Sequence, residues 1–161
     1  MSTLIKSVKA RQVYSNRGKP GVEAVITTEN GAVGRAMCTS GVSVGTHEVD
    51  FAFDGGKKFG GKGVQCVADR INTIAAPALI GVDTANQLAA DNAILNIGGN
   101  GKEALGGNAT AALSAAVLKA SVNSASPASS AVSSPNALWH EGLPRRISSL
   151  SIQGRSSCIS E

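Results

Sequence analysis

The sequence contains few aromatic residues. Only 3% of its 161 residues are Phe, Trp or Tyr, whereas 42% are apolar. A core must therefore be built from Ala, Val, Ile and Leu, which bury less surface per side chain than aromatic rings. The length suits one domain. We expect a small and marginally stable fold.

Cysteine and histidine are also scarce. Cys38, Cys66 and Cys158 form an odd set without a C-x-x-C pair, which is typical of free thiols in a reducing compartment. His47 and His140 add no metal-ligand spacing. The first residues show no signal peptide, and no stretch approaches the roughly 18 apolar residues of a membrane span. We expect a cytoplasmic protein with no membrane partner.

The charge is only mildly positive. The net charge is +4, from 15 basic and 11 acidic residues that are scattered along the chain. No dense Lys/Arg run is interleaved with aromatic residues. The sequence therefore predicts an ordinary solvated surface and no nucleic-acid partner.

Three strands are predicted near the N-terminus. Residues 3–14 are loosely strand-like, residues 21–28 alternate well, and residues 32–38 form a third run. Asn30-Gly31 lies between the second and third runs and is a strong hairpin signal, because both residues accept positive φ. These features predict an antiparallel meander.

Three helices are predicted after a glycine-rich stretch at residues 55–63. Apolar residues recur at helical spacing from Val64 to Pro77, a second helix is expected to begin at Asp83-Thr84, and residues 108–120 are rich in alanine. The second helix is expected to carry Leu88, Ala89, Ile94 and Leu95 and to continue until Gly98. Strands followed by helices indicate an α+β fold.

The composition changes at Ser121. Residues 121–161 contain thirteen Ser and three Pro, without a period of two or 3.6. Such a segment buries too little surface to offset the entropy of ordering it. We expect a domain over residues 1–120 and a disordered Ser/Pro-rich tail over residues 121–161.

Several motifs together resemble a known family. Residues 10–23 read A-R-Q-V-Y-S-N-R-G-K-P-G-V-E, and residues 40–48 read S-G-V-S-V-G-T-H-E. Residues 61–64 read G-K-G-V, and residues 105–116 read L-G-G-N-A-T-A-A-L-S-A-A. These segments resemble the N-terminal end of enolase, the phosphopyruvate hydratase of glycolysis.

The resemblance runs from about residue 5 to about residue 120. It implies a three-stranded meander covered by a helical layer. No sequence resembling the TIM barrel of the family follows. A truncated or frame-shifted reading frame would account for this.

The resemblance also implies a mobile substrate loop. Its members here are Ser40, Gly41, Ser43, Gly45 and His47. In the family, the position of Ser43 binds the second catalytic magnesium ion, for which a hydroxyl oxygen is a suitable ligand. Val44 replaces a Thr of the family. Because one Ser cannot hold magnesium alone, the isolated chain is not expected to bind the metal.

Arg11 and Glu23 match positions that form ion pairs across the family's dimer interface. In a chain without the barrel, both side chains are expected to face solvent, where a charge contributes little stability. The implied partners are a second copy of this chain or a full-length enolase subunit.

A second motif competes for the glycine-rich stretch. Gly56 to Gly63 nearly spells a phosphate-binding P-loop, but Gly63 replaces the required Ser or Thr. The G-K-G-V motif of enolases accounts for the stretch more simply, so nucleotide binding is the lesser alternative.

The resemblance implies a magnesium-dependent lyase that interconverts 2-phosphoglycerate and phosphoenolpyruvate. The family's Lys base, catalytic Glu and metal ligands lie on the barrel, so no catalytic residue is assigned here. We expect this chain alone to be inactive. The alternative is a non-catalytic interaction module that associates with itself or with a full-length enolase subunit.

Overall fold

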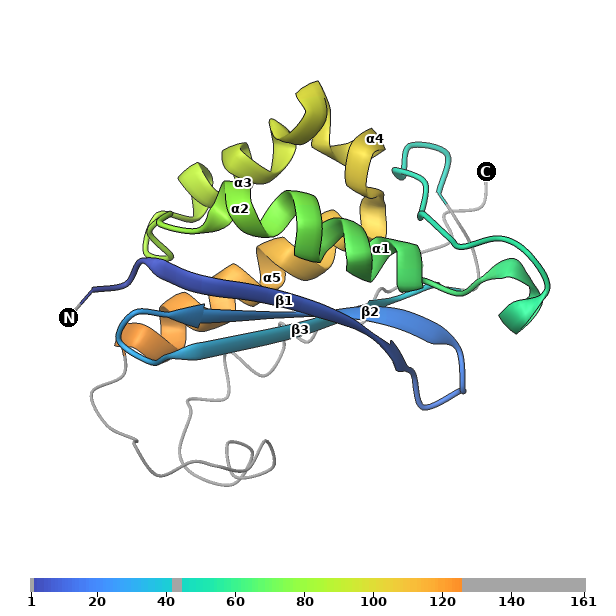
Figure 1. The fold of residues 1–161 in the computed structure, drawn as a ribbon, viewed down its shortest axis with the longest axis horizontal. Coiled ribbons are helices and arrows are strands. Elements are labelled where there is room, and N and C mark those ends of the chain that lie inside the picture. Colours follow the sequence, from blue (N-terminus) through green and yellow to red (C-terminus); the bar gives the residue numbers. More distant parts are fainter. Residues whose placement is uncertain (1, 42–44, 126–161) are drawn as a thin grey trace, which may run out of the picture.

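The computed structural model describes residues 2–41 and 45–125 (Figure 1). Three strands come first, β1 (Ile5–Tyr14), β2 (Pro20–Thr28) and β3 (Val33–Thr39). The helices are α1 (Gln65–Arg70), α2 (Ala76–Leu79), α3 (Gln87–Leu95), α4 (Gly101–Leu105) and α5 (Gly107–Ala125). The short turns η1 (Lys58–Gly61), η2 (Ile71–Ala75) and η3 (Ile97–Gly99) lie between them. The predicted α+β order is confirmed.

The sheet is an antiparallel meander in the order β1-β2-β3. The Asn30-Gly31 turn joins β2 to β3, with Thr27 opposite Val33. The predicted hairpin is confirmed, and of these two residues only Gly31 has positive φ. The Asn30 side chain instead accepts a hydrogen bond from the Ala32 amide, at 3.1 Å, and this local bond stabilises the turn.

The helix that begins at Gln65 contains a π turn. At η2 the Ala76 amide donates to the Ile71 carbonyl, five residues back. Pro77, two residues after the end of this turn, has no N–H to continue an α-helical ladder. From η2, the Asn72 amide group bonds both the N–H and the C=O of Ala10, at 2.8 and 3.0 Å. Asn72 therefore satisfies the exposed edge of β1 much as a neighbouring strand would.

The second predicted helix begins later than expected. Asn86 caps α3 by accepting from the Ala89 amide at 3.0 Å. Asp83 and Thr84 precede the helix and bond Thr3, eighty residues away, at 2.5 and 2.8 Å. Leu88 lies on α3, as predicted, and its side chain is 71% exposed.

Helix α5 continues past the predicted domain boundary. It ends at Ala125, so the expectation of disorder from Ser121 is wrong for residues 121–125. The rest of the predicted tail, residues 126–161, lies outside the described residues.

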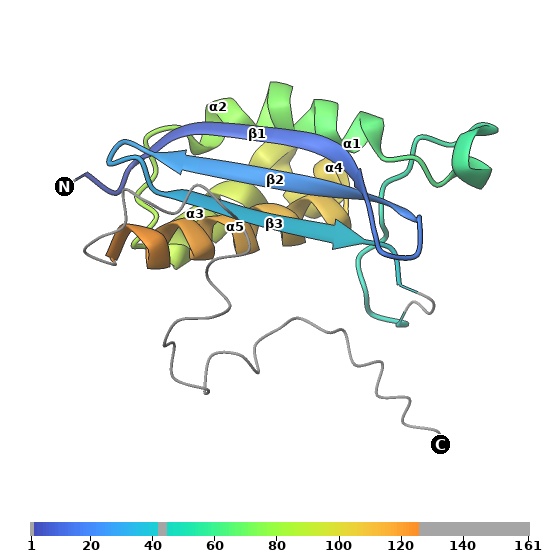
Figure 2. The same cartoon turned by 90° about the horizontal axis from the view of Figure 1, so that it is seen from below.

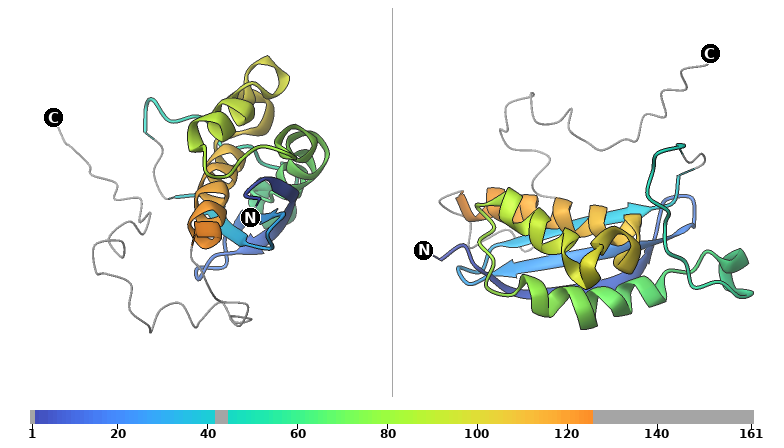
Figure 3. Two further views of the ribbon diagram at one scale, coloured as in Figure 1. Left: turned by 90° about the vertical axis from the view of Figure 1, so that its left-hand side faces the viewer. Right: turned by 90° about the horizontal axis from the view of Figure 1, so that it is seen from above.

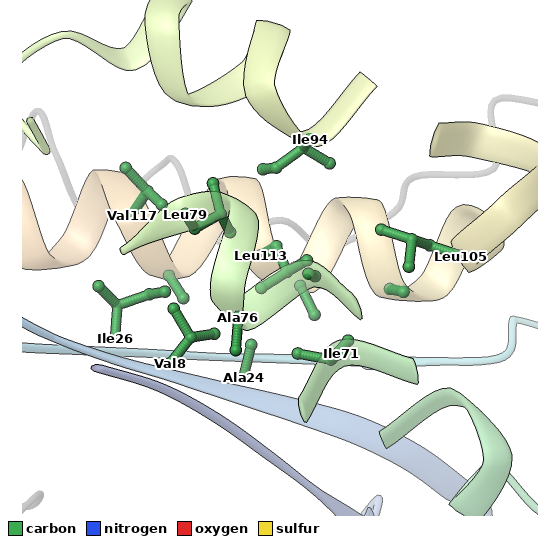
Figure 4. Close-up of a cluster of buried hydrophobic side chains, with 14 of the residues drawn as sticks. Val8, Ala24, Ile26, Ile71, Ala76, Leu79, Ile94, Leu105, Leu113 and Val117 are labelled. Atoms are coloured by element: carbon green, nitrogen blue, oxygen red, sulfur yellow. The ribbon is translucent and has the colours of Figure 1, made fainter. Parts of the chain in front are cut away.

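The helices cover one face of the sheet (Figures 1, 2 and 3). The core between these layers contains aliphatic side chains and no aromatic ring among the described residues, as the composition predicts (Figure 4). Many of its members are alanines, including Ala109, Ala112, Ala116 and Ala120 on α5. None of the helices within residues 2–41 and 45–125 is long and apolar enough to cross a membrane.

Helix α5 lies closely against the sheet at Gly34 of β3. A Cβ atom at this position would overlap the Ala116 carbonyl oxygen and the Ala120 amide nitrogen, both of which are backbone atoms. Backbone atoms cannot rotate away as a side chain can. The absence of a side chain at Gly34 therefore sets the distance between the helix and the sheet.

Gly34→Ala should destabilise the domain by about 3 kcal/mol or more, because the added methyl group forces α5 away from the sheet. Urea unfolding followed by circular dichroism measures the change. Arg35→Ala, at an exposed position of the same strand, serves as the control and should stay within about 0.5 kcal/mol of the parent. Equal stabilities for the Gly34→Ala chain and the parent would contradict this packing.

Candidate functional site

The predicted substrate loop leaves the sheet at the end of β3. Of its five predicted members, Ser40, Gly41, Gly45 and His47 are described, whereas Ser43 lies outside the described residues. The His47 side chain is exposed. The Glu48 amide donates to the Gly45 carbonyl at 3.1 Å, which closes a local turn. The described members therefore lie together on one surface loop.

Asn108, at the start of α5, holds the segment that follows this loop. The Asn108 side chain is 1% exposed. Its Oδ1 accepts from the Ala52 amide at 3.2 Å, and its Nδ2 donates to the Ala52 carbonyl at 2.9 Å. One amide side chain thus satisfies both backbone groups of Ala52, which otherwise have no strand partner.

Two glycines allow this close approach. Gly106 has φ of 92°, and a Cβ atom there would lie 2.6 Å from the Ala52 Cβ. A Cβ atom on Gly107 would lie 2.7 Å from the Val49 carbonyl oxygen, and the Gly107 amide donates to the Asp50 carbonyl at 2.9 Å. The segment after the loop is therefore held by the N-terminal end of α5.

The near end of the loop faces the turn between β1 and β2. A cleft of about 250 Å³ separates them and is lined by Ser15, Asn16, Arg17, Lys19, Thr39, Ser40 and Gly41. The Ser15 hydroxyl accepts from the amides of Arg17 and Lys19, at 3.3 and 3.2 Å, which fixes the turn. The fold thus brings the predicted loop residues Ser40 and Gly41 beside two cations.

A second loop, residues 54–63, is closed by Asp54. Its carboxylate accepts from the amides of Gln65 and Cys66 at the start of α1, at 2.9 and 2.7 Å. Desolvation opposes ionisation of Asp54. Hydrogen bonds from the Cys66 thiol and from the two amides outweigh this effect and hold the pKa of Asp54 below its usual value. Asp54 therefore caps a helix whose own first residues supply no side-chain cap.

This arrangement argues against the P-loop alternative. The two amides that could cradle a phosphate at the start of α1 already bind the Asp54 carboxylate. A Cβ atom on Gly63 would lie 2.5 Å from Asp54 Oδ2. Gly63 is therefore explained by the close approach of Asp54, and neither Ser nor Thr would fit there without displacing that carboxylate.

Arg11 and Glu23 lie directly opposite each other on β1 and β2. The Arg11 Nε donates to Glu23 Oε2 at 2.6 Å, with the two side chains 64% and 17% exposed. Arg11 is exposed, as expected, whereas Glu23 is half-buried, and the two charges pair within one chain. Their predicted role in a dimer interface stays a prediction.

The described residues do not form a magnesium site. Within residues 2–41 and 45–125, no group of three or more His, Cys, Asp or Glu side chains could hold a metal ion. Magnesium requires several oxygen ligands in near-octahedral geometry. A single loop hydroxyl does not meet this requirement, so no chemical step through a metal follows from these residues.

Sequence reasoning missed Asp54 and Asn108, which hold the loops that flank the site. Asn108 lies within the L-G-G-N segment, and its signal is an amide residue directly after two glycines at a helix start. Asp54 precedes the glycine pair of its loop. Neither partner could be named from spacing alone, because the bonds join residues 56 and 11–12 positions apart.

The described domain is similar in sequence to the N-terminal part of known enolases. A family model described as the enolase N-terminal domain matches residues 5–128. Enolase 2 from Methanospirillum hungatei is 43% identical over 125 residues, which cover 77% of this chain and 29% of that protein. The enolase from Methanococcus vannielii is 44% identical over 123 residues, covering 76% of this chain and 29% of that protein. The chain therefore spans less than a third of the length of these relatives.

Asp54→Ala should destabilise the domain by about 1 kcal/mol at neutral pH, because two amides of α1 lose their acceptor. Since folding lowers the pKa of Asp54, its contribution is present above the usual carboxyl pKa of 3.8 and is lost as the pH falls through the folded-state value. The free energy of unfolding, measured between neutral and acidic pH, should depend less on pH in the variant than in the parent. Glu103→Ala removes an exposed carboxylate elsewhere and should keep the parental profile. Parallel profiles for the parent and Asp54→Ala would refute this role.

Asn108→Ala should destabilise the domain by about 1–3 kcal/mol, because it leaves the backbone of Ala52 without partners. Amide hydrogen exchange should show faster exchange at Ala52 than in the parent. Asn92→Ala, at an exposed position of α3, is the matched control and should leave that exchange unchanged. Unaltered protection of Ala52 in Asn108→Ala would show that another group holds the segment.

Proposed function

The chain belongs to the enolase family through its N-terminal domain, and from this premise we propose that it serves a phosphopyruvate hydratase. The reaction is the interconversion of 2-phosphoglycerate and phosphoenolpyruvate in glycolysis. The observation that carries the proposal is the loop of residues 40–48, which leaves β3 beside the cleft at Arg17 and is followed by a segment that Asn108 holds at Ala52.

The proposed role of the domain is to carry this loop to a catalytic centre on another part of the enzyme. Both anchors belong to the rigid layers, since Thr39 ends β3 and Asn108 lies in the first turn of α5. Between them, Gly41 and Gly45 leave the backbone free to change conformation. Such a loop can close over a substrate while the domain itself stays unchanged.

We further propose that Ser43 contributes an oxygen ligand to magnesium when the loop closes. A hydroxyl oxygen is a suitable ligand for this hard cation. The metal would stabilise the negative charge of the enolate, and its other ligands would come from outside the described residues. Ser40, Gly41, Gly45 and His47 would shape the loop around the substrate.

A polypeptide of residues 1–161 is proposed to be inactive by itself. The described part of the chain presents no cluster of His, Cys, Asp or Glu side chains that could hold the metal. The free thiols of Cys38 and Cys66 suit a reducing compartment, which supports a cytoplasmic location. Burial raises the pKa of Cys38 to about 11, so this thiol stays protonated at neutral pH.

A second candidate function is a non-catalytic interaction module. Large apolar side chains are exposed on α3 and α5, namely Leu88 at 71%, Leu118 at 50% and Val122 at 57%. Exposed apolar surface of this kind favours association. The proposed partners are a second copy of the chain or a full-length enolase subunit. Arg11 and Glu23 would lie in the interface with either partner. Sedimentation of the chain alone and with a full-length enolase distinguishes the two partners.

A chimera tests the proposed function directly. Residues 1–125 replace the matching region of Methanospirillum hungatei Enolase 2, and turnover of 2-phosphoglycerate is measured with magnesium. The chimera should be active, whereas residues 1–161 alone should show no turnover. Ser43→Ala in the chimera should lower kcat about 10–100-fold through weakened metal binding.

Thr46→Ala, at an exposed position of the same loop, is the control and should leave kcat unchanged. A folded chimera without activity would contradict the assignment of the domain. Full activity of the Ser43→Ala chimera would contradict the role of the loop. Turnover by residues 1–161 alone would contradict the proposed inactivity.

A further inference from the structure

Two basic segments that are far apart in the sequence meet at one end of the fold. The β1–β2 turn carries Arg17 and Lys19, and the loop of residues 54–63 carries Lys57, Lys58 and Lys62. Figures 1 and 3 show this turn and this loop at the same end of the molecule. We call these five side chains the basic end.

Contacts with β1 hold the two segments together. The rings of Tyr14 and Phe59 meet with their centroids 5.6 Å apart and their planes inclined at 57°. The Val64 amide donates to Gln12 Oε1 at 2.9 Å, which ties the end of the lysine loop to the same strand. The gathering of the cations is therefore built into the fold.

Little negative charge offsets the basic end. Asp54 is the only carboxylate in residues 14–19 and 54–63, and it is engaged by two backbone amides. Four of the five cations are exposed, and Lys19 is half-buried. Their field is thus directed at the solvent and favours an anionic ligand.

Two aromatic rings lie exposed among these cations. Tyr14 is 54% exposed and Phe59 is 48% exposed, in a chain that has very few aromatic residues. Phe59 has φ of 53°, a left-handed conformation that side-chain-bearing residues rarely adopt. A glycine would adopt this conformation at position 59 without strain, as Gly60 and Gly61 do at the next two positions. The loop nevertheless carries an aromatic ring there.

We propose that the basic end binds single-stranded nucleic acid. The cations would contact successive phosphates, and the rings of Tyr14 and Phe59 would stack with unpaired bases. The cleft between Arg17 and Ser40 provides hydroxyl and amide groups for one further phosphate. The rings favour this ligand over an acidic protein or a membrane surface, because bases present the flat faces with which exposed rings stack.

The inference requires no catalytic activity, although it shares the cleft at Arg17 with the proposed substrate loop. It also revises the expectation of no nucleic-acid partner, which depended on the absence of one dense Lys/Arg run. The cations come from two segments about 40 residues apart in sequence, and no linear scan places them together.

Fluorescence anisotropy of a labelled oligouridylate of about 12 nucleotides, with the 161-residue protein, tests the proposal. Binding should be saturable. The logarithm of the association constant should fall linearly with the logarithm of the salt concentration, with a slope of about −3. The double variant Lys57→Ala/Lys58→Ala should bind about tenfold or more weakly at low salt, and the magnitude of its slope should be smaller. Phe59→Leu, which keeps an apolar side chain but removes the ring, should weaken binding about fivefold without changing the slope.

Lys102→Ala with Lys119→Ala is the matched control, because it removes the same charge from exposed positions of α4 and α5. It should leave the affinity within about twofold, since the removed charges do not touch a phosphate. Each variant is first compared with the parent by thermal unfolding, so that loss of fold is not read as loss of binding.

Any one of several results would overturn the proposal. Two such results are the absence of saturable binding at low salt and an equal loss of affinity in the control variant. Two others are parental affinity in Phe59→Leu and displacement of the oligonucleotide by inorganic phosphate at the same total phosphate concentration. Vesicles of anionic phospholipid that bind more tightly than the oligonucleotide, with the same dependence on Lys57 and Lys58, would likewise assign this surface to a membrane instead.

Discussion

The close contact between helix α5 and strand β3 is the constraint on which the rest of the structure depends. Gly34 has no side chain, and the facing helix presents alanines such as Ala116 and Ala120. Two backbones can therefore approach without a large side chain between them. A chain with so few aromatic residues cannot fill a wide gap between its layers, so it forms a tight interface of small and aliphatic side chains instead.

This contact also positions the candidate site. Because α5 lies fixed against the sheet, Asn108 in its first turn is fixed as well, and through Asn108 so is the backbone at Ala52. The other end of the substrate loop begins at Thr39, where β3 ends. Both attachment points of the loop thus belong to one packing unit, and the loop spans them. This is a suitable design for a domain that presents a loop to a catalytic centre elsewhere.

Local signals in the sequence predicted much of the fold. Alternation predicted β2, the Asn30-Gly31 pair predicted the hairpin, and the alanine-rich segment predicted α5. The errors arose where distant contacts decide the structure. Asp83 could begin a helix by its residue type, but the hydrogen bond from Thr3 keeps it in an extended connection. The ion pair between Arg11 and Glu23 likewise depends on strand register, which sequence alone did not specify.

Native-state hydrogen exchange of the 161-residue chain tests the central claim most directly, namely that α5 and the sheet form one cooperative unit that holds the loop from both ends. The account predicts that amides of Ile26, Ala36 and Leu113 exchange with a common free energy equal to that of global unfolding. Amides of Thr46 and His47 should exchange far more readily. Exchange of Leu113 at a clearly lower free energy than that of Ile26 would mean that α5 opens separately from the sheet, and would contradict the account.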